Sequence, residues 1–263
     1  MDRFALTKWY LDSVDAGGRS AILYSTAIAW GRARVGWHGV SICEPDQRAA
    51  HRGSVRPMPL PEREADRLVW RADPLGCIVV CTPNVPPFAR RLLDRADGVL
   101  DWRCEAPAAR VDVTLTDAPP LCGAGYAECL SLTFLPSRLP IDEMRWGRWV
   151  SDDAARSLVW IDWKGPHPRT DVYLDGRSEP SPVVVGDRDV QAGGVRLTMA
   201  PRRPLYSRSL GSALAGLSPV LTLLPASWRE LEDAKWICRA RLDGPGGRTD
   251  DGWCIDEVVR FPR

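Results

Sequence analysis

Apolar and polar residues alternate with a period of two through most of this chain, and this feature constrains the fold more than any other. In segment 110–116 the two valines and the leucine fall on one face. Segment 157–163 places Leu158, Trp160 and Asp162 on one face. Such alternation is typical of β-strands whose two faces meet different surroundings. The chain is therefore expected to be rich in strands.

Short strands recur at regular spacing, separated by Gly-rich turns such as 192–194 and 244–247. Besides the two segments above, strands are predicted at 20–30, 35–43, 67–71, 76–82, 146–150, 170–175, 195–200, 235–242 and 253–260. This pattern favours an all-β sandwich or barrel.

Few segments favour helix. Short helices are predicted at 87–96 and 227–234, the second with Ser227 as N-cap and Glu230 three residues later. Segment 45–65 is polar and Pro-rich, which predicts a long exposed loop. A boundary between two β-domains, 1–120 and 121–263, is predicted after Pro119-Pro120. No repeat is visible, although two diverged copies of a barrel would leave little trace.

Charge and composition exclude several classes of function. The net charge is +1, with 35 basic and 34 acidic residues, so no strong field attracts nucleic acid. The start of the chain lacks a secretion signal pattern, and the longest apolar stretch, 21–30, is too short to cross a bilayer. A cytoplasmic location is expected. The three histidines have no metal-ligand spacing, and no nucleotide-binding motif is present, so neither a metal nor an organic cofactor is expected.

Eight cysteines and twelve tryptophans are the unusual totals. No C-x-x-C occurs, and the closest cysteines, Cys77 and Cys81, flank an apolar strand. Buried free thiols are therefore predicted rather than a metal site. Most tryptophans are expected in the core of a sheet, and the remainder could line a cavity for an apolar ligand.

Several motifs, taken in order, resemble the carotenoid 1,2-hydratase (hydroxyneurosporene synthase) family. The matching stretches are Lys8-Trp9-Tyr10-Leu11-Asp12, the alternating strand 111–115, Gly123-Ala124-Gly125-Tyr126 with Glu128, Arg145-Trp146-Gly147-Arg148-Trp149, Val159-Trp160-Ile161-Asp162, and Pro204-Leu205-Tyr206-Ser207-Arg208-Ser209. The resemblance implies two lipocalin-like antiparallel barrels packed together. It also implies hydration of a terminal C=C bond of an acyclic carotenoid or related isoprenoid. The family's Asn-Trp-Gly after the acid is absent here, because Cys129 follows Glu128.

Alkene hydration requires a proton donor, stabilisation of a tertiary cation, and a held water molecule. A carboxylic acid in an apolar site suits the first task, and aromatic faces suit the second. The resemblance places the acid at Asp162, whose strand is aromatic. Glu128, after a Gly-x-Gly-Tyr turn, is predicted to pair with Tyr126 and hold water.

The remaining candidates would bind substrate. Trp146, Trp149 and Trp160 are predicted to form walls against the substrate. Arg148 is predicted to pair with either Asp162 or Glu128. A tight pair with Asp162 would lower the pKa of that acid, which would then be deprotonated and unable to donate a proton.

Two alternatives remain open from the sequence. One is a non-catalytic lipocalin-like carrier of an apolar ligand, which the absent Asn-Trp-Gly favours. The other is a cyclase or isomerase acting on a hydrophobic substrate. A carotenoid-like ligand would come from a membrane, so peripheral contact with the inner membrane is compatible with either reading, although the sequence shows no anchor. The oligomeric state is not indicated.

Overall fold

The structure is a computed structural model that describes residues 4–47, 49–56, 58–180, 182–209 and 231–261. The chain divides into two compact units, unit 1 (Met1–Arg138) and unit 2 (Leu139–Arg263). Nearly all the described residues that have regular structure are in strands, and their helical turns are short 3₁₀ segments at Asp73–Leu75, Pro136–Arg138 and Pro245–Gly247. Within this part of the chain there is no helix with the length and apolar character required to span a membrane.

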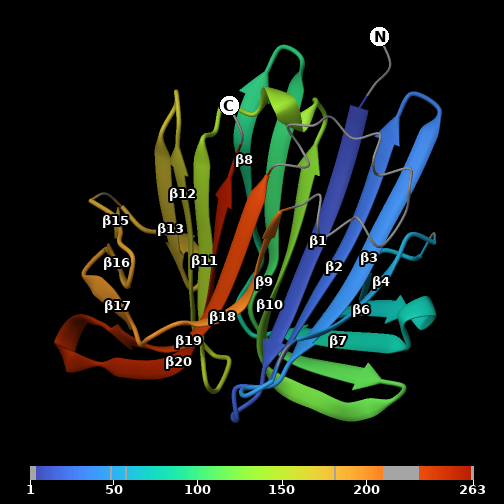
Figure 1. Cartoon of the computed structure of the whole chain (residues 1–263). Helices are drawn as coiled ribbons and strands as arrows, with labels where there is room; N and C mark the ends of the chain where they lie inside the picture. Colours follow the sequence, from blue (N-terminus) through green and yellow to red (C-terminus); the bar gives the residue numbers. More distant parts are fainter. Residues whose placement is uncertain (1–3, 48, 57, 181, 210–230, 262–263) are drawn as a thin grey trace. The chain divides into compact units, whose positions relative to one another are not determined.

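Unit 1 contains one antiparallel sheet, coloured blue to light green in Figure 1. Its strands are β1 (Phe4–Val14), β2 (Ser20–Trp30), β3 (Ala33–Cys43), β4 (Ala50–Ser54), β5 (Glu62–Glu64), β6 (Arg67–Ala72), β7 (Cys77–Pro83), β8 (Phe88–Arg95), β9 (Gly98–Leu115) and β10 (Ala118–Leu132). The order across the sheet is β4-β3-β2-β1-β10-β9-β7-β6-β5, and β8 pairs with β9 beside this path.

Unit 2 contains a second antiparallel sheet, coloured yellow-green to red in Figure 1. Its strands are β11 (Glu143–Ser151), β12 (Ser157–Lys164), β13 (Arg169–Leu174), β14 (Arg177–Ser178), β15 (Val184–Val185), β16 (Asp189–Ala192), β17 (Val195–Met199), β18 (Arg203–Ser209), β19 (Glu232–Asp243) and β20 (Thr249–Arg260). The order is β14-β13-β12-β11-β20-β19-β17-β16-β15, and β18 pairs with β19.

The two sheets have the same topology. Each strand of unit 1 corresponds to the strand of unit 2 that comes ten strands later, including the side strands β8 and β18. The hairpins that open the two units end alike, with Val14 opposite Ser20 and Val150 opposite Ser157. The chain is therefore an internal structural repeat, which the sequence does not reveal by eye.

The central strands are buried on both faces. In β1 every residue from Trp9 to Val14 is buried, and in β11 every residue from Trp146 to Ser151. One face of each sheet carries an apolar core cluster, with Trp9, Trp70 and Val111 among its members in unit 1. The opposite face of the central strands is also buried, and it carries polar groups. Two-sided burial makes the surroundings of every polar side chain on these strands decisive.

Most predicted strands match the structure, and the exceptions have physical causes. The helix predicted at 87–96 is wrong, because Phe88–Arg95 forms β8, where pairing with β9 outweighs local helix preference. Of the predicted helix 227–234, residues 227–230 lie outside the described residues, and residues 232–234 belong to β19. The predicted loop 45–65 contains β4 and β5.

The boundary between the units also differs from the prediction. It lies between Arg138 and Leu139 rather than after residue 120. Residue 120 falls inside β10, which pairs with β9 on one side and β1 on the other. The predicted boundary relied on a Pro-Pro pair that belongs to the start of a strand and not to a linker between domains.

Seven of the eight cysteines are buried, and the eighth is Cys122. The seven buried side chains follow the prediction, whereas Cys122 is exposed. Burial raises the pKa of both Cys77 and Cys81 to about 12, which keeps these thiols protonated and unreactive near neutral pH.

The carboxylate of Glu143 ties together the ends of three central strands of unit 2. It bonds Lys164 Nζ at 2.7 Å, Arg145 Nε at 3.2 Å and Arg260 Nε at 3.2 Å. Hydrogen bonds from Lys164 and Arg145 lower the pKa of Glu143 from 4.5 to about 2. The stabilisation is therefore complete above pH 4.5 and is lost as the pH falls from 4.5 toward 2.

We expect Glu143→Gln to destabilise the protein at pH 7 and to do so much less at pH 3. Urea unfolding of both proteins at the two pH values measures this. An equal loss of unfolding free energy at pH 7 and pH 3 would contradict the assignment.

Candidate functional site

A row of side chains crosses the sheet of unit 1 on the face opposite the core cluster. From β3 to β8 it consists of Gly39, Tyr24, Tyr10, Glu128, Cys104 and Phe88. Residues directly opposite one another on neighbouring strands share a face. Glu128 thus lies in the middle of the sheet, between an aromatic ring on β1 and a buried thiol on β9.

Two neutral donors hold the carboxylate of Glu128 at the same oxygen. The hydroxyl of Tyr126 donates to Oε2 at 2.7 Å, and the indole N–H of Trp102 donates to Oε2 at 2.6 Å. Both donor side chains are almost completely buried. The predicted contact between Tyr126 and Glu128 is therefore present. Sequence reasoning missed Trp102, which the sequence separates from Glu128 by a full hairpin.

Aromatic rings surround this carboxylate. The ring centroids of Tyr10 and Tyr126 are 6.2 Å apart, and those of Phe88 and Trp102 are 5.2 Å apart in an edge-to-face arrangement. Burial, together with the adjacent Cys104 and Glu128, raises the pKa of Tyr126 well above its usual range. Tyr126 therefore remains a hydrogen-bond donor over the whole physiological pH range.

The Gly-x-Gly-Tyr motif has a backbone cause, although it is part of strand β10 and not the predicted turn. A Cβ atom on Gly123 would lie 2.0 Å from the carbonyl oxygen of Val14, and one on Gly125 would lie 2.1 Å from that of Asp12. Only glycine permits this close approach of β1. The two glycines thus let β10 bring Tyr126 and Glu128 onto the buried face.

Unit 2 carries an equivalent row at the same position of its repeat. Tyr10 and Trp146 both stand four residues before the last pair of their opening hairpins. Opposite them lie Glu128 and Glu257, respectively. From β13 to β18 the row of unit 2 consists of Asp171, Ile161, Trp146, Glu257, Lys235 and Tyr206. A glutamate thus occupies the same place in both repeats.

The two equivalent glutamates have different partners. Oε2 of Glu257 accepts a hydrogen bond from Nζ of Lys235 at 3.0 Å, where unit 1 has Cys104 in the place of the lysine. Lys235 is fully buried, and its Nζ lies 4.9 Å from the centroid of the Trp146 ring. The hydroxyl of Tyr206 donates to Asp233 at 3.1 Å. Glu257 therefore pairs with a lysine at the position of the repeat where Glu128 lies opposite a thiol.

The predicted site residues of unit 2 are divided between two faces of its sheet. Asp162 shares a face with Trp149 and Trp160, whereas Trp146 and Arg148 lie on the opposite face. The hydroxyl of Thr170 donates to Oδ1 of Asp162 at 2.7 Å. A single predicted site containing all five residues is therefore wrong, since a strand presents successive side chains to opposite faces.

Arg148 is completely buried and donates from Nη1 to the carbonyl oxygen of Trp253 at 2.7 Å. The register of β11 against β12 places Arg148 and Asp162 on opposite faces of the sheet. The ion pair that would lower the pKa of Asp162 therefore does not form. A pair between Arg148 and Glu128 stays a prediction.

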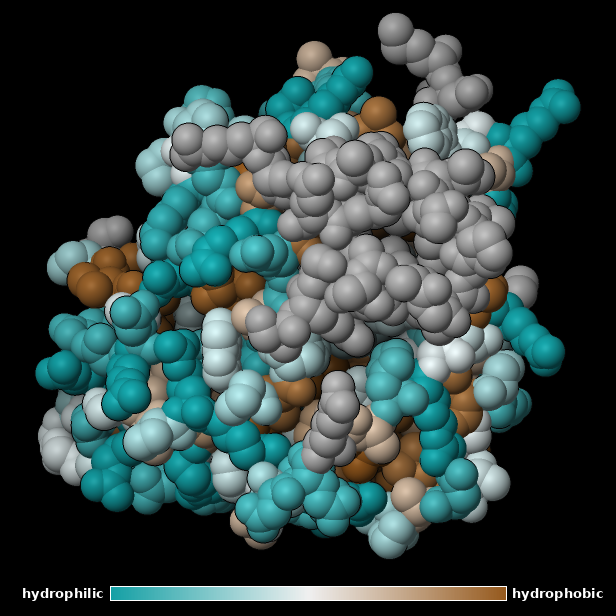
Figure 2. Space-filling model, in the orientation of Figure 1, coloured by the Kyte–Doolittle hydropathy of each residue, from teal (hydrophilic) through white to brown (hydrophobic). Residues whose placement is uncertain are grey.

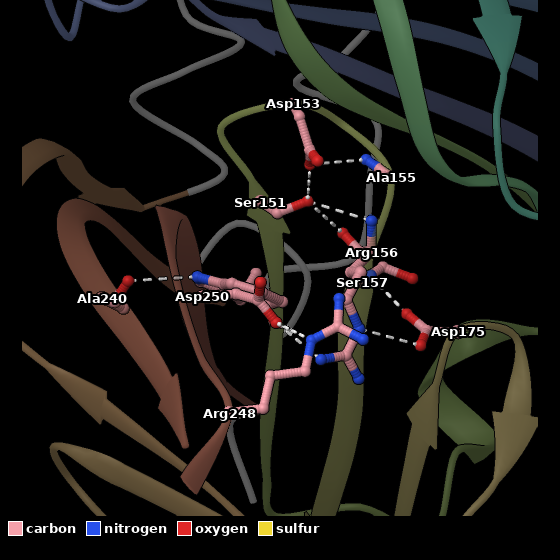
Figure 3. Close-up of polar contacts among 10 residues, drawn as sticks. Ser151, Asp153, Ala155, Arg156, Ser157, Asp175, Ala240, Arg248 and Asp250 are labelled. Atoms are coloured by element: carbon pink, nitrogen blue, oxygen red, sulfur yellow. Dashed lines mark hydrogen bonds and ion pairs between the residues drawn. The ribbon is translucent and has the colours of Figure 1, made fainter. Parts of the chain in front are cut away.

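Packing and turn closure account for the residues near the β11–β12 hairpin. The indole N–H of Trp149 donates to the carbonyl oxygen of Ala240 at 3.2 Å inside the core cluster. Figure 3 shows the polar network beside it, in which Arg156 bonds Asp175 at 3.2 Å and Asp250 at 2.7 Å. This network ties the hairpin to neighbouring strands. Trp149 is therefore packed in the core of unit 2 and does not form the predicted wall against a substrate.

Comparisons with known proteins establish the fold. No protein-family model matches the chain, and no curated protein matches its sequence. A provisional AttH from Nitrosomonas europaea is 13% identical, with 99% of this chain and 93% of that chain covered and a TM-score of 0.57. Kievitone hydratase from Nectria haematococca is 7% identical, with coverages of 97% and 88% and a TM-score of 0.56. CghA is 12% identical, with coverages of 98% and 88% and a TM-score of 0.53.

These similarities confirm the predicted all-β class with two lipocalin-like antiparallel barrels. At such low identities they show the fold alone. The motif resemblance to carotenoid 1,2-hydratases is thus supported as far as this shared two-barrel architecture.

The place of Trp160 in unit 2 can be tested through Gly147, which lies opposite it on β11. A Cβ atom on Gly147 would lie 2.1 Å from the Trp160 ring. We expect Gly147→Ala to lower the unfolding free energy by about 1–3 kcal/mol because the ring must move. Gly17→Ala, whose Cβ would lie 3.4 Å from its nearest neighbour, is the matched control. Chemical denaturation measures both, and an unchanged Gly147→Ala protein would contradict this packing.

Proposed function

We propose that the protein is a cofactor-independent hydro-lyase that adds water to a C=C bond of an acyclic carotenoid or related isoprenoid. The observation that supports this best is the half-buried Glu128 carboxyl group, held among aromatic rings by the buried side chains of Tyr126 and Trp102. The printed names of similar folds include one hydratase, kievitone hydratase. This similarity of fold is consistent with the proposal.

The chemistry assigns separate tasks to the residues of this cluster. Glu128, in its protonated form, would donate a proton to one alkene carbon, which leaves a tertiary cation at the other. The faces of Tyr10 and Tyr126 would stabilise that cation, because aromatic quadrupoles attract positive charge. Water would then attack the cation and return a proton to the Glu128 carboxylate, which completes the cycle. Tyr126 and Trp102 would orient the carboxyl group throughout.

Glu128 is a better candidate for the acid than Asp162. Its donors, Tyr126 and Trp102, are 0% and 1% exposed and both bond Oε2, which fixes the orientation of the carboxyl group. Asp162 is bonded to the partly exposed Thr170 near the end of β12. A carboxyl group held in one orientation by buried donors, as Glu128 is, is better suited to catalysis.

We expect Glu128→Gln to lower the rate of hydration at least about 100-fold, because the amide cannot donate the proton. Incubation with lycopene or neurosporene, followed by mass spectrometry for the gain of one water, measures the rate. Glu105→Gln is the matched control, since Glu105 forms surface ion pairs with Arg63 and Arg103 on the same sheet. Full activity of the Glu128→Gln protein would refute the proposed acid.

A second pair of variants separates the two candidate acids. We expect Asp162→Asn to keep activity within about threefold of wild type, as should Asp171→Asn on the opposite face of the same sheet. Loss of activity in Asp162→Asn alone would transfer the acid role to Asp162. Tight binding of the carotenoid by every variant, with no gain of water in wild type, would instead support the lipocalin-like carrier.

A further inference from the structure

Asp256, on β20, is a buried carboxyl group whose two oxygens have different surroundings. The residue is 6% exposed. Oδ2 accepts a hydrogen bond from Nη1 of Arg202 at 2.6 Å. Oδ1 is buried as well, but within the described part of the chain no group donates a hydrogen bond to it. Buried acceptors normally have a donor, so this oxygen points to a partner that the described residues do not supply.

Indole rings lie on both sides of this carboxyl group. The row that crosses the sheet here, on the core face of unit 2, consists of Val172, Trp160, Gly147, Asp256 and Trp236. Because Trp160 lies over Gly147, its ring extends toward β20 and Asp256. On the other side, the guanidinium carbon of Arg202 lies 4.9 Å from the centroid of the Trp236 ring. Arg202 is thereby fixed against both Trp236 and Asp256.

Asp256 stands at the border between the dry core and a partly exposed rim. The neighbouring row on one side belongs to the core cluster and contains Trp149, Leu158 and Cys254. The neighbouring row on the other side consists of Thr170, Asp162, Arg145, Val258 and Ala234, and all five are partly exposed. A molecule that enters from this rim meets the carboxyl group before it meets the core.

The charges around Asp256 select the kind of molecule. Arg202, Lys235 and Arg145 all act on the carboxyl group as positive charges, so an organic cation would be repelled. Burial nevertheless raises the pKa of Asp256 above its usual value, the effect of desolvation exceeding that of these cations. A dry, partly compensated carboxyl group beside indole rings suits a neutral hydrogen-bond donor on an apolar body.

We propose that unit 2 binds an apolar alcohol at this place. The hydroxyl of the ligand donates to Oδ1 of Asp256, and its hydrocarbon part extends along the partly exposed side chains of Trp236, Val258 and Ala234. Arg202 is a positioning residue that holds the carboxyl group. This binding site belongs to unit 2 alone and requires no turnover, so it stands or falls separately from the proposed hydration.

Farnesol and its methyl ether form a matched pair of probes, because the ether lacks the donor hydrogen. We expect wild type to bind farnesol at least about tenfold more tightly than the ether, as measured by titration of tryptophan fluorescence. In Asp256→Asn, the amide oxygen must face Arg202, so an NH₂ group replaces Oδ1. The preference should then disappear, because the oxygens of both probes can accept from that NH₂ group.

Asp171→Asn serves as the control, since Asp171 lies on the opposite face of the sheet and forms an ion pair with Arg169. This variant should keep the preference for farnesol. The proposal is overturned if wild type binds neither probe, if it binds both equally, if Asp256→Asn keeps the preference, or if Asp171→Asn also loses it. The two wild-type outcomes overturn it even where Asp256→Asn does not fold.

Discussion

Burial of both faces of the central strands is the constraint on which the rest of this structure depends. A strand with one solvated face can place any polar residue outward without cost, but β1, β10, β11 and β20 have no such face over much of their length. Each polar side chain there must find a partner or lower the stability of the fold. The donors around Glu128 and the ion pair of Glu257 are two solutions of this one problem.

The repeat shows how the two solutions diverged. At one position of the strand ladder both units place a glutamate, yet the residue opposite it on the next strand is Cys104 in unit 1 and Lys235 in unit 2. The lysine provides a full positive charge at 3.0 Å, which compensates its glutamate as a carboxylate. At the equivalent position of unit 1, Oε2 of Glu128 accepts hydrogen bonds from Tyr126 and Trp102. One position of the repeat therefore supports two different polar networks.

The sequence was informative wherever local pattern decides the structure. Alternation predicted 20–30 as a strand, and β2 spans Ser20–Trp30. It failed where distant pairing decides, as in β8, whose partner β9 overrides a helical pattern. The contact between Tyr126 and Glu128 was accessible because residues two apart on a strand share a face. Trp102 was not accessible, since its contact with Glu128 depends on the register of β9 against β10, including the irregularities near Ala127.

Register also explains why the predicted site in unit 2 was too large. Arg145, Trp146, Gly147, Arg148 and Trp149 read as one motif in sequence, but β11 sends odd and even positions to opposite faces. One set joins Asp162 and the core, and the other joins Glu257. When a strand is buried on both sides, the alternate residues of one sequence motif lie on opposite faces and contact different sets of side chains. Asp256 escaped notice for the same reason, because its neighbours, Trp160 and Arg202, become neighbours only when the strands of the sheet are ordered.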